Sequence, residues 1–274
     1  MFKIIIMALL IFIGMVGYDN ITDKAQPTTP VQQEQQKVSK HEKSAAMALF
    51  VSLLPPKEEW PSPVHKFYLA FNMDEVIDPI RQNPNWTSLD AMSRDIPQAL
   101  IAIEDHAFYN HGAIAVEGIL RAALANINAG EVVQGGSTLT QQFVKNVFLS
   151  HEQSMERKIE EAVLSLMLED NYSKDEILEL YLNTTYFGAG STGIKQASRT
   201  YFGKAPSALT LAEAAVIASL PYAPTGLNPL ENPAGCKKRQ LLVLAAMHKY
   251  GMINQGQLAE AKAEKIRLTN GTVM

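Results

Sequence analysis

The chain has 274 residues, of which 47% are apolar, and a net charge of −4 at neutral pH. Its length and apolar content suffice for one sizeable core or two lobes. The acidic balance, with no basic cluster beyond Lys237-Lys238-Arg239, argues against nucleic acid as a partner. The single cysteine, Cys236, excludes an intrachain disulfide and any multi-cysteine metal site, and we expect it to be a small core residue.

The first part of the chain indicates a membrane. After Lys3, residues 4–17 form a run of 14 apolar residues or glycines, between the length of a signal-peptide core and the roughly 20 residues of a full span. We favour an uncleaved anchor over residues 1–18, because no small-residue cleavage site follows, and a cleaved signal peptide is the alternative. Either one places the rest of the chain outside the cytoplasm, since the positive charge precedes the run and Asp19 and Asp23 follow it.

Three further segments follow the apolar run. Residues 19–43 are rich in Gln, Thr, Pro and Lys without an apolar period, which is typical of a flexible linker. Residues 44–87 alternate short apolar runs with prolines and predict a packed N-terminal extension of unassigned function. Helical signals dominate residues 88–270, so we expect one mainly α domain there.

Capping residues and apolar periodicity predict the helices of this domain. They are expected at residues 95–107, 114–129, after Ser137 as the cap, after Ser154, and at residues 177–186, 211–220 and 233–250, the last of them. The patterns Ser173-x-x-Glu176 and Thr210-x-x-Glu213 are capping boxes. Residues 265–268 are a candidate short strand.

The helix after Ser137 carries a polar stripe. Its members lie at i, i+3, i+4 and i+7 and are Thr138, Gln141, Gln142 and Lys145. Threonine and glutamine both donate and accept hydrogen bonds, which suits a sugar or amide ligand, and a polar surface is the alternative. Gly135-Gly136 before the helix would leave its N-terminus open to an anion.

Two carboxylate clusters flank this stripe in the sequence. Arg157 and Glu161 are four residues apart with Lys158 beside them, and alone they would predict a surface salt bridge. Glu104-Asp105 falls at a helix end. Two carboxylates with amides and cations suggest glycosyl chemistry, in which one carboxylate is a base or nucleophile and the basic residues neutralise a phosphate leaving group. Zinc-site spacings and a serine nucleophile elbow are both missing from the sequence.

Together, these motifs resemble the peptidoglycan glycosyltransferases of family 51. That module occurs alone in monofunctional biosynthetic transglycosylases and is fused to a transpeptidase in class A penicillin-binding proteins. The likeness covers roughly residues 86–251. Its ordered blocks are residues 104–111, 135–146, 157–161, 179–188 with 201–204, and 220–229 with Arg239, Val243 and Leu244. We expect no transpeptidase module, because Ser-x-x-Lys and Lys-Thr-Gly do not occur in the sequence.

The resemblance implies a lysozyme-like fold of two lobes and a substrate, lipid II, which is a disaccharide-pentapeptide on undecaprenyl diphosphate. The expected reaction joins lipid II into β-1,4 glycan strands with inversion at the cytoplasmic membrane. The likeness also allows cell-wall synthesis proteins as partners, and a divalent cation, Mg or Mn, at the diphosphate. It makes the helix at residues 114–129 a jaw that dips into the membrane.

The same resemblance assigns the site residues. Glu104 is the catalytic base, and Glu161 is the second catalytic carboxylate, which positions the diphosphate network. The substrate-binding residues are Asp105, Ser137, Thr138, Gln141, Gln142, Lys145, Asn146, Arg157 and Lys158. Among them Asp105 is expected to support Glu104, while Lys145, Arg157 and Lys158 line the diphosphate.

The chain departs from the family pattern in several positions. Ala113 and Ala115 follow His111 where the family usually has an Asp, and Gln153 stands where an arginine is common. Thr192 and Leu227 replace usual tyrosines. Ala115 and Gln153 are the only support for the alternative, a weakly active or non-catalytic partner that binds lipid II or a cell-wall synthase. A glycan hydrolase is disfavoured, because the cationic residues anticipate a diphosphate that glycan lacks.

Overall fold

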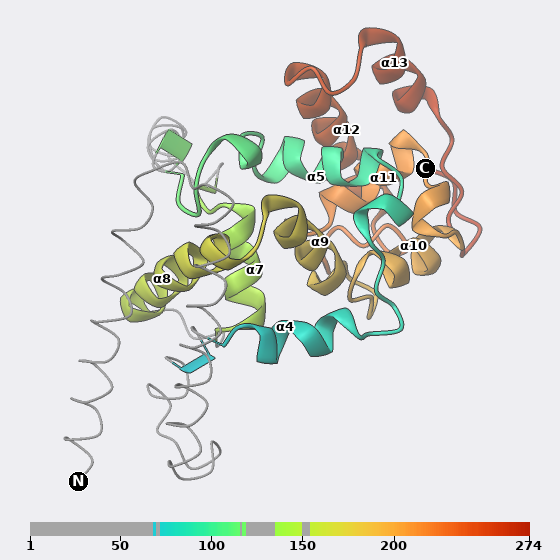
Figure 1. Ribbon diagram of the computed structural model, residues 1–274. Helices are drawn as coiled ribbons and strands as arrows, with labels where there is room; N and C mark the ends of the chain where they lie inside the picture. Colours follow the sequence, from blue (N-terminus) through green and yellow to red (C-terminus); the bar gives the residue numbers. More distant parts are fainter. Residues whose placement is uncertain (1–67, 70–71, 116, 119–134, 150–153) are drawn as a thin grey trace, which may run out of the picture. The chain divides into compact units, whose positions relative to one another are not determined.

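The computed structural model describes residues 68–69, 72–115, 117–118, 135–149 and 154–274 (Figure 1). The chain divides into two units, Met1–His65 and Lys66–Met274, and the described residues all belong to the second. The expected anchor, the linker and most of the N-terminal extension and of the jaw helix lie outside the described residues. Among the described helices, none combines the length and apolar character that crossing a bilayer requires.

The described part of the chain is mainly α-helical, as predicted. Its α-helices are α4 (Asp74–Arg81), α5 (Asp95–Glu104), α7 (Leu139–Val147), α8 (Met155–Asn171), α9 (Lys174–Thr184), α10 (Ile194–Phe202), α11 (Leu211–Ser219), α12 (Pro233–Lys249) and α13 (Gln255–Ala263). Short 3-10 turns occur at Leu89–Ala91, Phe108–Asn110 and Pro206–Ala208. The expected strand at residues 265–268 is an isolated bridge between Arg267 and Val273.

The capping signals fix most helix starts. Ser154, Ser173 and Thr210 each accept a hydrogen bond from the backbone N–H three residues on, as predicted. The cap of α7 is Thr138 rather than Ser137. Thr138 has the extended backbone of a cap and forms a reciprocal capping box with Gln141. With Ser137 as the cap, Gln141 would lie one residue too far along the helix to form this box.

The bounds of α5 and α9 and the number of helices differ from expectation. Helix α9 runs over Lys174–Thr184 rather than residues 177–186. Helix α5 ends at Glu104 rather than at residue 107, because the backbone of Asp105 leaves the helical region (φ −157°, ψ 69°). Helix α12 is not the last. The prediction overlooked the capping box of Asn254 with Gln257, which begins α13.

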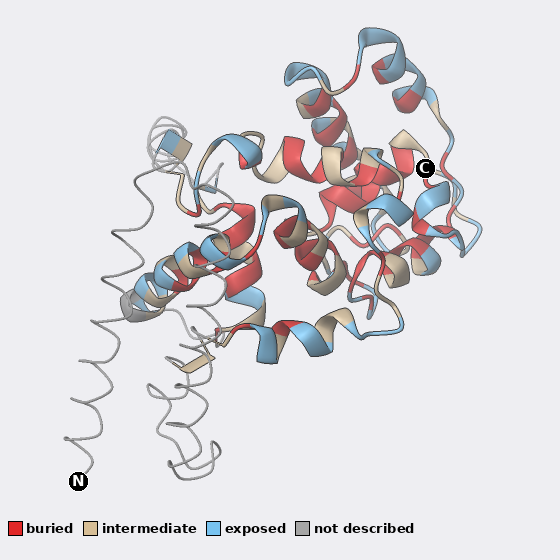
Figure 2. Cartoon of the chain, in the orientation of Figure 1, coloured by how far each residue is buried: buried red, intermediate tan, exposed pale blue. Residues whose placement is uncertain are grey.

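The core of this unit is built around α11. All residues of α11 after Leu211 are buried, and the helix packs against α5 and α12 (Figure 2). The one charged residue of α11, Glu213, is buried and pairs with Lys204 at 2.6 Å. A helix that is otherwise largely apolar on every side belongs in an interior. Cys236 on α12 is fully buried there, which confirms it as a core residue, and burial raises the pKa of its thiol to about 11.

A second group of helices, α7, α8 and α9, packs beside one another. Helix α7 contacts both α8 and α9, and α4 contacts α9. Arg81 at the end of α4 pairs with Glu176 on α9 at 2.9 Å, and the backbone N–H of Thr87 donates to Asn183 Oδ1 at 2.9 Å. Residues 72–87 are therefore attached to the body of this unit. The end of α5 is joined to the first turns of α7 by hydrogen bonds of Glu104 and Asp105, two of the predicted site residues.

Candidate active site

Glu104 is the last residue of α5 and is partly exposed. Gln142 on α7 donates from Nε2 to Glu104 Oε2 at 2.9 Å. The other end of the same amide, Gln142 Oε1, accepts from the hydroxyl of Tyr181 on α9 at 3.0 Å. Side chains from three helices thus form one chain of hydrogen bonds that ends at the Glu104 carboxylate.

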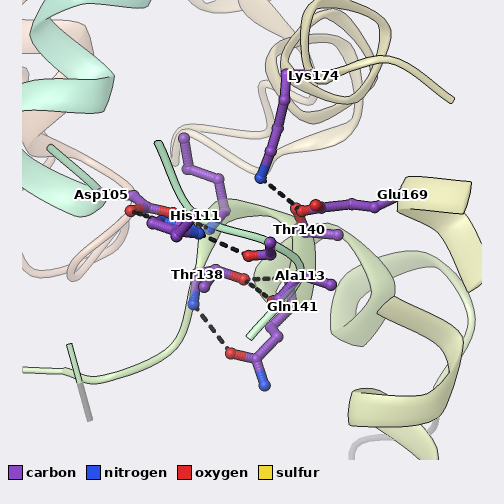
Figure 3. Close-up of polar contacts among 10 residues, drawn as sticks. Asp105, His111, Ala113, Thr138, Thr140, Gln141, Glu169 and Lys174 are labelled. Atoms are coloured by element: carbon purple, nitrogen blue, oxygen red, sulfur yellow. Dashed lines mark hydrogen bonds and ion pairs between the residues drawn. The ribbon is translucent and has the colours of Figure 1, made fainter. Parts of the chain in front are cut away.

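Asp105 binds the start of α7. Its Oδ2 accepts the backbone N–H of Leu139 at 3.0 Å, and its Oδ1 lies 2.6 Å from His111 Nε2 (Figure 3). The other ring nitrogen of His111 lies 2.6 Å from the Gly112 carbonyl oxygen. A carboxylate at a helix N-terminus interacts favourably with the helix dipole. Asp105 therefore joins the loop after α5 to the first turn of α7.

This contact corrects the expectation of an open anion site at the N-terminus of α7. The N–H of Leu139 is already bound by Asp105, and the N–H of Gln141 is bound by the Thr138 hydroxyl at 3.1 Å. The space beside Gly135 is open, because a Cβ added there would have no atom within 4 Å.

The predicted polar stripe separates into buried and exposed residues. Thr138 and Gln141 are buried, and besides the capping box the Thr138 hydroxyl donates to the Ala113 carbonyl at 2.7 Å (Figure 3). The hydrogen bonds of these two side chains are therefore made within the protein, to the first turn of α7 and to the Ala113 carbonyl. Lys145 and Asn146 are exposed on α7. Gln142 lies between the two groups and contacts Glu104.

Glu161 lies on α8 and its side chain is only 2% exposed. The ammonium group of Lys158 contacts Glu161 Oε1, and Arg157 Nη1 lies 3.8 Å from Glu161 Oε2. The burial rules out the simple surface salt bridge that spacing alone suggested. Ser165, which is fully buried, donates to the Glu161 carbonyl at 2.6 Å and braces this turn of α8.

The cations beside Glu161 have spare hydrogen-bonding capacity. Arg157 Nε is buried and makes no hydrogen bond within the described part of the chain. Both cations lie in the first turns of α8, where the helix dipole is positive. One buried carboxylate next to two cations leaves an excess of positive charge, and a guanidinium presents several donors to a phosphate. The cluster can therefore accept an anionic group.

The two carboxylates are connected to the same stretch of chain, residues 137–142. Gln142 contacts Glu104, while Lys158 lies 3.2 Å from the Ser137 hydroxyl and also contacts Glu161. The structure thus brings Glu104, Ser137, Gln142, Arg157, Lys158 and Glu161 into one connected site. Asp105, Thr138 and Gln141 support this site through hydrogen bonds to the backbone. Within the described part of the chain, Lys145 and Asn146 form no side-chain hydrogen bond or ion pair with the other predicted site residues.

The side chains do not fit a divalent cation. The described residues contain no group of three His, Cys, Asp or Glu placed to hold a metal ion. The carboxylate oxygens of Glu161 face Lys158 and Arg157, whose charges oppose a second cation. Mg²⁺ and Mn²⁺ bind through several oxygen ligands. Within the described ranges, the cations beside Glu161 are those of Arg157 and Lys158.

Sequence reasoning gave no role to Tyr181, although the residue lies within one of the motif blocks. It is 1% exposed and sits among the apolar side chains of α9. A buried tyrosine nearly always finds a hydrogen-bond partner. The position of Tyr181 on the apolar face of a predicted helix was the available signal, but the partner could not be read from the sequence.

A partly exposed carboxylate and a buried carboxylate with two cations, both linked to residues 137–142, form a site of the kind that glycosyl transfer uses. Comparison with known proteins agrees. Residues 73–248 match the family model described as Transglycosylase. The chain therefore belongs to the transglycosylase family, and it is a peptidoglycan glycosyltransferase, as the resemblance predicted.

Similar proteins fall into two groups by length. A protein of Cupriavidus necator named as a transglycosylase is 41% identical over 194 residues, which are 71% of this chain and 84% of that protein. Penicillin-binding protein 2D of Bacillus subtilis is 45% identical over 181 residues, which are 66% of this chain but 26% of that protein. The chain thus spans about a quarter of that longer relative. The crystal structure of penicillin-binding protein 1A from Haemophilus influenzae is 33% identical over 48% of this chain and 16% of that chain, and its TM-score of 0.34 is too low to bear on the fold.

Proposed function

We propose that this glycosyltransferase polymerises lipid II into β-1,4 glycan strands, with inversion and release of undecaprenyl diphosphate. The observation that carries the proposal is the connection of Glu104 and the Glu161 cluster to the same six-residue stretch, through Gln142 on one side and Ser137 on the other. A reaction centre between them would have a proton acceptor on one side and a cationic group on the other.

Glu104 is the general base in this proposal. It takes the proton from the acceptor's 4-hydroxyl as that oxygen attacks the anomeric carbon of the donor glycan. Its partial exposure lets an incoming sugar reach it, and the hydrogen bond from Gln142 fixes one of its oxygens, leaving the other for the acceptor. A single displacement of this kind inverts the anomeric configuration.

The leaving diphosphate binds the cations beside Glu161. Negative charge builds up on the diphosphate as the bond to the anomeric carbon breaks, and Arg157 and Lys158 neutralise it. Glu161 keeps both cations in place through its two oxygens. Lys145, which is exposed on α7, is free to add a further positive charge when the substrate is bound.

The remaining features follow from the same substrate. Lipid II lies in a membrane, so an N-terminal anchor in residues 1–18 would hold the domain on the outer face of the cytoplasmic membrane. A lysozyme-like arrangement of two lobes would hold the growing strand between them. Cell-wall synthesis proteins are candidate partners, because the polymer must be joined to existing wall.

The departures from the family pattern do not remove the proposed chemistry. Ala115 and Gln153 gave the non-catalytic alternative its support, and Gln153 lies outside the described residues. Glu104, Glu161 and both cations beside Glu161 are present, and Glu104 has a hydrogen-bond donor. We therefore propose a catalytic protein.

Polymer formation from purified lipid II, followed on a gel, tests this function. Full-length wild-type protein is compared with Glu104→Gln, which keeps the shape and removes the base, and with Glu260→Gln, which removes an exposed carboxylate on α13. We expect polymer from the wild type and from Glu260→Gln, and a loss of at least about a hundredfold in Glu104→Gln, the usual contribution of a general base. A thermal melt confirms that each variant is folded.

Two outcomes would contradict the proposal. Polymerisation by Glu104→Gln at the wild-type rate would remove Glu104 from its role. A wild-type protein that binds lipid II and makes no polymer would restore the binding-partner alternative.

A further inference from the structure

We infer that Tyr181 is a positioning residue for the reaction, which orients the Gln142 amide so that its N–H group, and not its carbonyl, faces Glu104. The inference deepens the proposed function and rests on Glu104 as the base. It assigns a role to a side chain that touches neither substrate nor the reacting atoms.

The geometry is a chain of two hydrogen bonds across three helices. The Tyr181 hydroxyl donates to Gln142 Oε1 at 3.0 Å, and Gln142 Nε2 donates to Glu104 Oε2 at 2.9 Å. Tyr181 is 1% exposed and Gln142 is partly buried. Both distances are those of ordinary hydrogen bonds.

The donors and acceptors allow this chain to run in one direction only. An ionised carboxylate accepts hydrogen bonds and cannot donate, so Gln142 must present its NH₂ group to Glu104. The amide oxygen then points the opposite way, where a donor is needed. Tyr181 supplies that donor. A phenylalanine at this position would leave the amide oxygen of the partly buried Gln142 without this donor, and rotation of the amide by 180° would bring that oxygen toward Glu104.

Tyr181 can serve as a donor at every pH at which the enzyme would work. Burial raises the pKa of its hydroxyl well above the usual value, and the nearby charge of Glu104 raises it further. A hydroxyl that stays protonated keeps the Gln142 amide in one orientation. Other titratable groups near this chain of hydrogen bonds are Asp105 and His111, which bind each other, and Lys145, which is exposed. Helix α9 also carries Lys174, Asp175, Glu176 and Glu179, each of which binds a partner of its own, and α8 carries the ion-paired Arg157, Lys158 and Glu161.

Loss of the Tyr181 hydroxyl should therefore change the ionisation behaviour of the reaction as well as its rate. A hydrogen bond donated to a carboxylate favours the charged form, whereas a carbonyl oxygen facing it favours the protonated form. In Tyr181→Phe the acidic limb of the pH dependence of kcat/KM should move to higher pH by about 1 unit, and kcat at neutral pH should fall by about tenfold. KM should change little, because no substrate contact is removed.

Tyr201→Phe is the matched control. Tyr201 is fully buried and its hydroxyl donates to the Phe187 carbonyl at 2.7 Å, so the same substitution removes a comparable buried hydrogen bond that is not connected to Glu104. We expect Tyr201→Phe to lose stability to a similar extent but to keep the wild-type pH profile. A Tyr181→Phe variant with the pH profile of Tyr201→Phe would overturn the inference.

A double-mutant cycle tests whether Tyr181 acts through Gln142. Gln142→Ala removes the intermediate amide, and adding Tyr181→Phe to it should then cause no further loss of kcat. An equal fold-loss in both backgrounds would show that Tyr181 acts independently of Gln142, and the inference would be wrong.

A spectroscopic readout separates this inference from the proposed function. In full-length protein labelled with ¹⁵N-glutamine, the Gln142 side-chain signal is identified by its loss in Gln142→Ala. In the wild type we expect two well-separated proton signals from the Gln142 amide, one of them from the proton donated to Glu104. The chemical shift of that proton should change in Tyr181→Phe and stay the same in Tyr201→Phe. If wild-type protein made no polymer yet showed this pattern, the proposed function would fail and the orienting role would stand. Identical Gln142 signals in Tyr181→Phe and wild type would overturn the orienting role, whatever the activity.

Discussion

The buried position of Glu161 predicts a large loss of stability when its charge is removed. Glu161→Gln keeps the shape of the side chain but leaves Arg157 and Lys158 without a counter-charge. At 3.8 Å, unit charges in surroundings of effective dielectric constant about 20 attract by about 4 kcal/mol. The Lys158 side chain is 48% exposed, so its pairing with Glu161 adds at most about 1 kcal/mol. The neutral amide retains part of the hydrogen bonding.

We therefore expect Glu161→Gln to lose about 3 kcal/mol of unfolding free energy, the low end of the range for breaking a buried ion pair. For a folded unit of this size, that loss lowers Tm by about 6–12 °C. The assay is thermal unfolding followed by circular dichroism, at low and at high salt. Salt should alter the difference little, because a buried pair is poorly screened.

Glu176→Gln provides the control, since it breaks an ion pair whose two side chains are both more exposed than those of Arg157 and Glu161. Arg81 and Glu176 are 2.9 Å apart, with side chains 34% and 45% exposed. An exposed pair contributes at most about 1 kcal/mol, so the change in Tm should be less than about 4 °C. If Glu161→Gln melted at the wild-type temperature, or no lower than Glu176→Gln, the reasoning from burial would be refuted.

Two further predictions concern the ends of helices. Thr138→Ala should lower the unfolding free energy measured in urea by about 1–2 kcal/mol, because it removes the cap of α7 and the hydrogen bond to the Ala113 carbonyl. Ser137→Ala should change the unfolding free energy by less than about 0.5 kcal/mol. Equal effects of the two substitutions would mean that Ser137 shares the capping role. The pKa of Glu176 is lowered chiefly by the backbone N–H of Ser173, so its contribution to stability is present above pH 4.5 and is lost as the pH falls through the lowered pKa. The stability difference between wild type and Glu176→Gln should therefore shrink below pH 4.5, and a difference that grew on acidification would contradict the sign.

Local signals predicted the fold well where the structure depends on neighbours in sequence. The capping boxes at Ser173 and Thr210 need only residues three apart, so both could be read directly. The cap at Thr138 was assigned one residue too early, because serine and threonine are adjacent there and either can cap a helix. The end of α5 was placed too late, since the departure of Asp105 from the helix depends on its bond to Leu139, which is distant in sequence.

Burial within the site could not be predicted from spacing. Arg157 and Glu161 show the same i, i+4 pattern whether the pair is exposed or buried, and only packing makes Glu161 a buried carboxylate. The helical period placed Thr138, Gln141 and Gln142 in one stripe, although Thr138 is the cap and precedes α7. It could not show that Gln141 turns back to its own helix start while Gln142 reaches another helix.

The shared support of the two carboxylates has a consequence for how substitutions in residues 137–142 must be interpreted. In the proposed reaction, proton removal and departure of the diphosphate take place on opposite sides of one carbon atom, and this short stretch holds the residues that serve both. A shift of the stretch by a fraction of an ångström would disturb bond making and bond breaking together. Rate losses measured at Ser137 and Gln142 would then describe one concerted event, and neither could be attributed to a single half of the reaction.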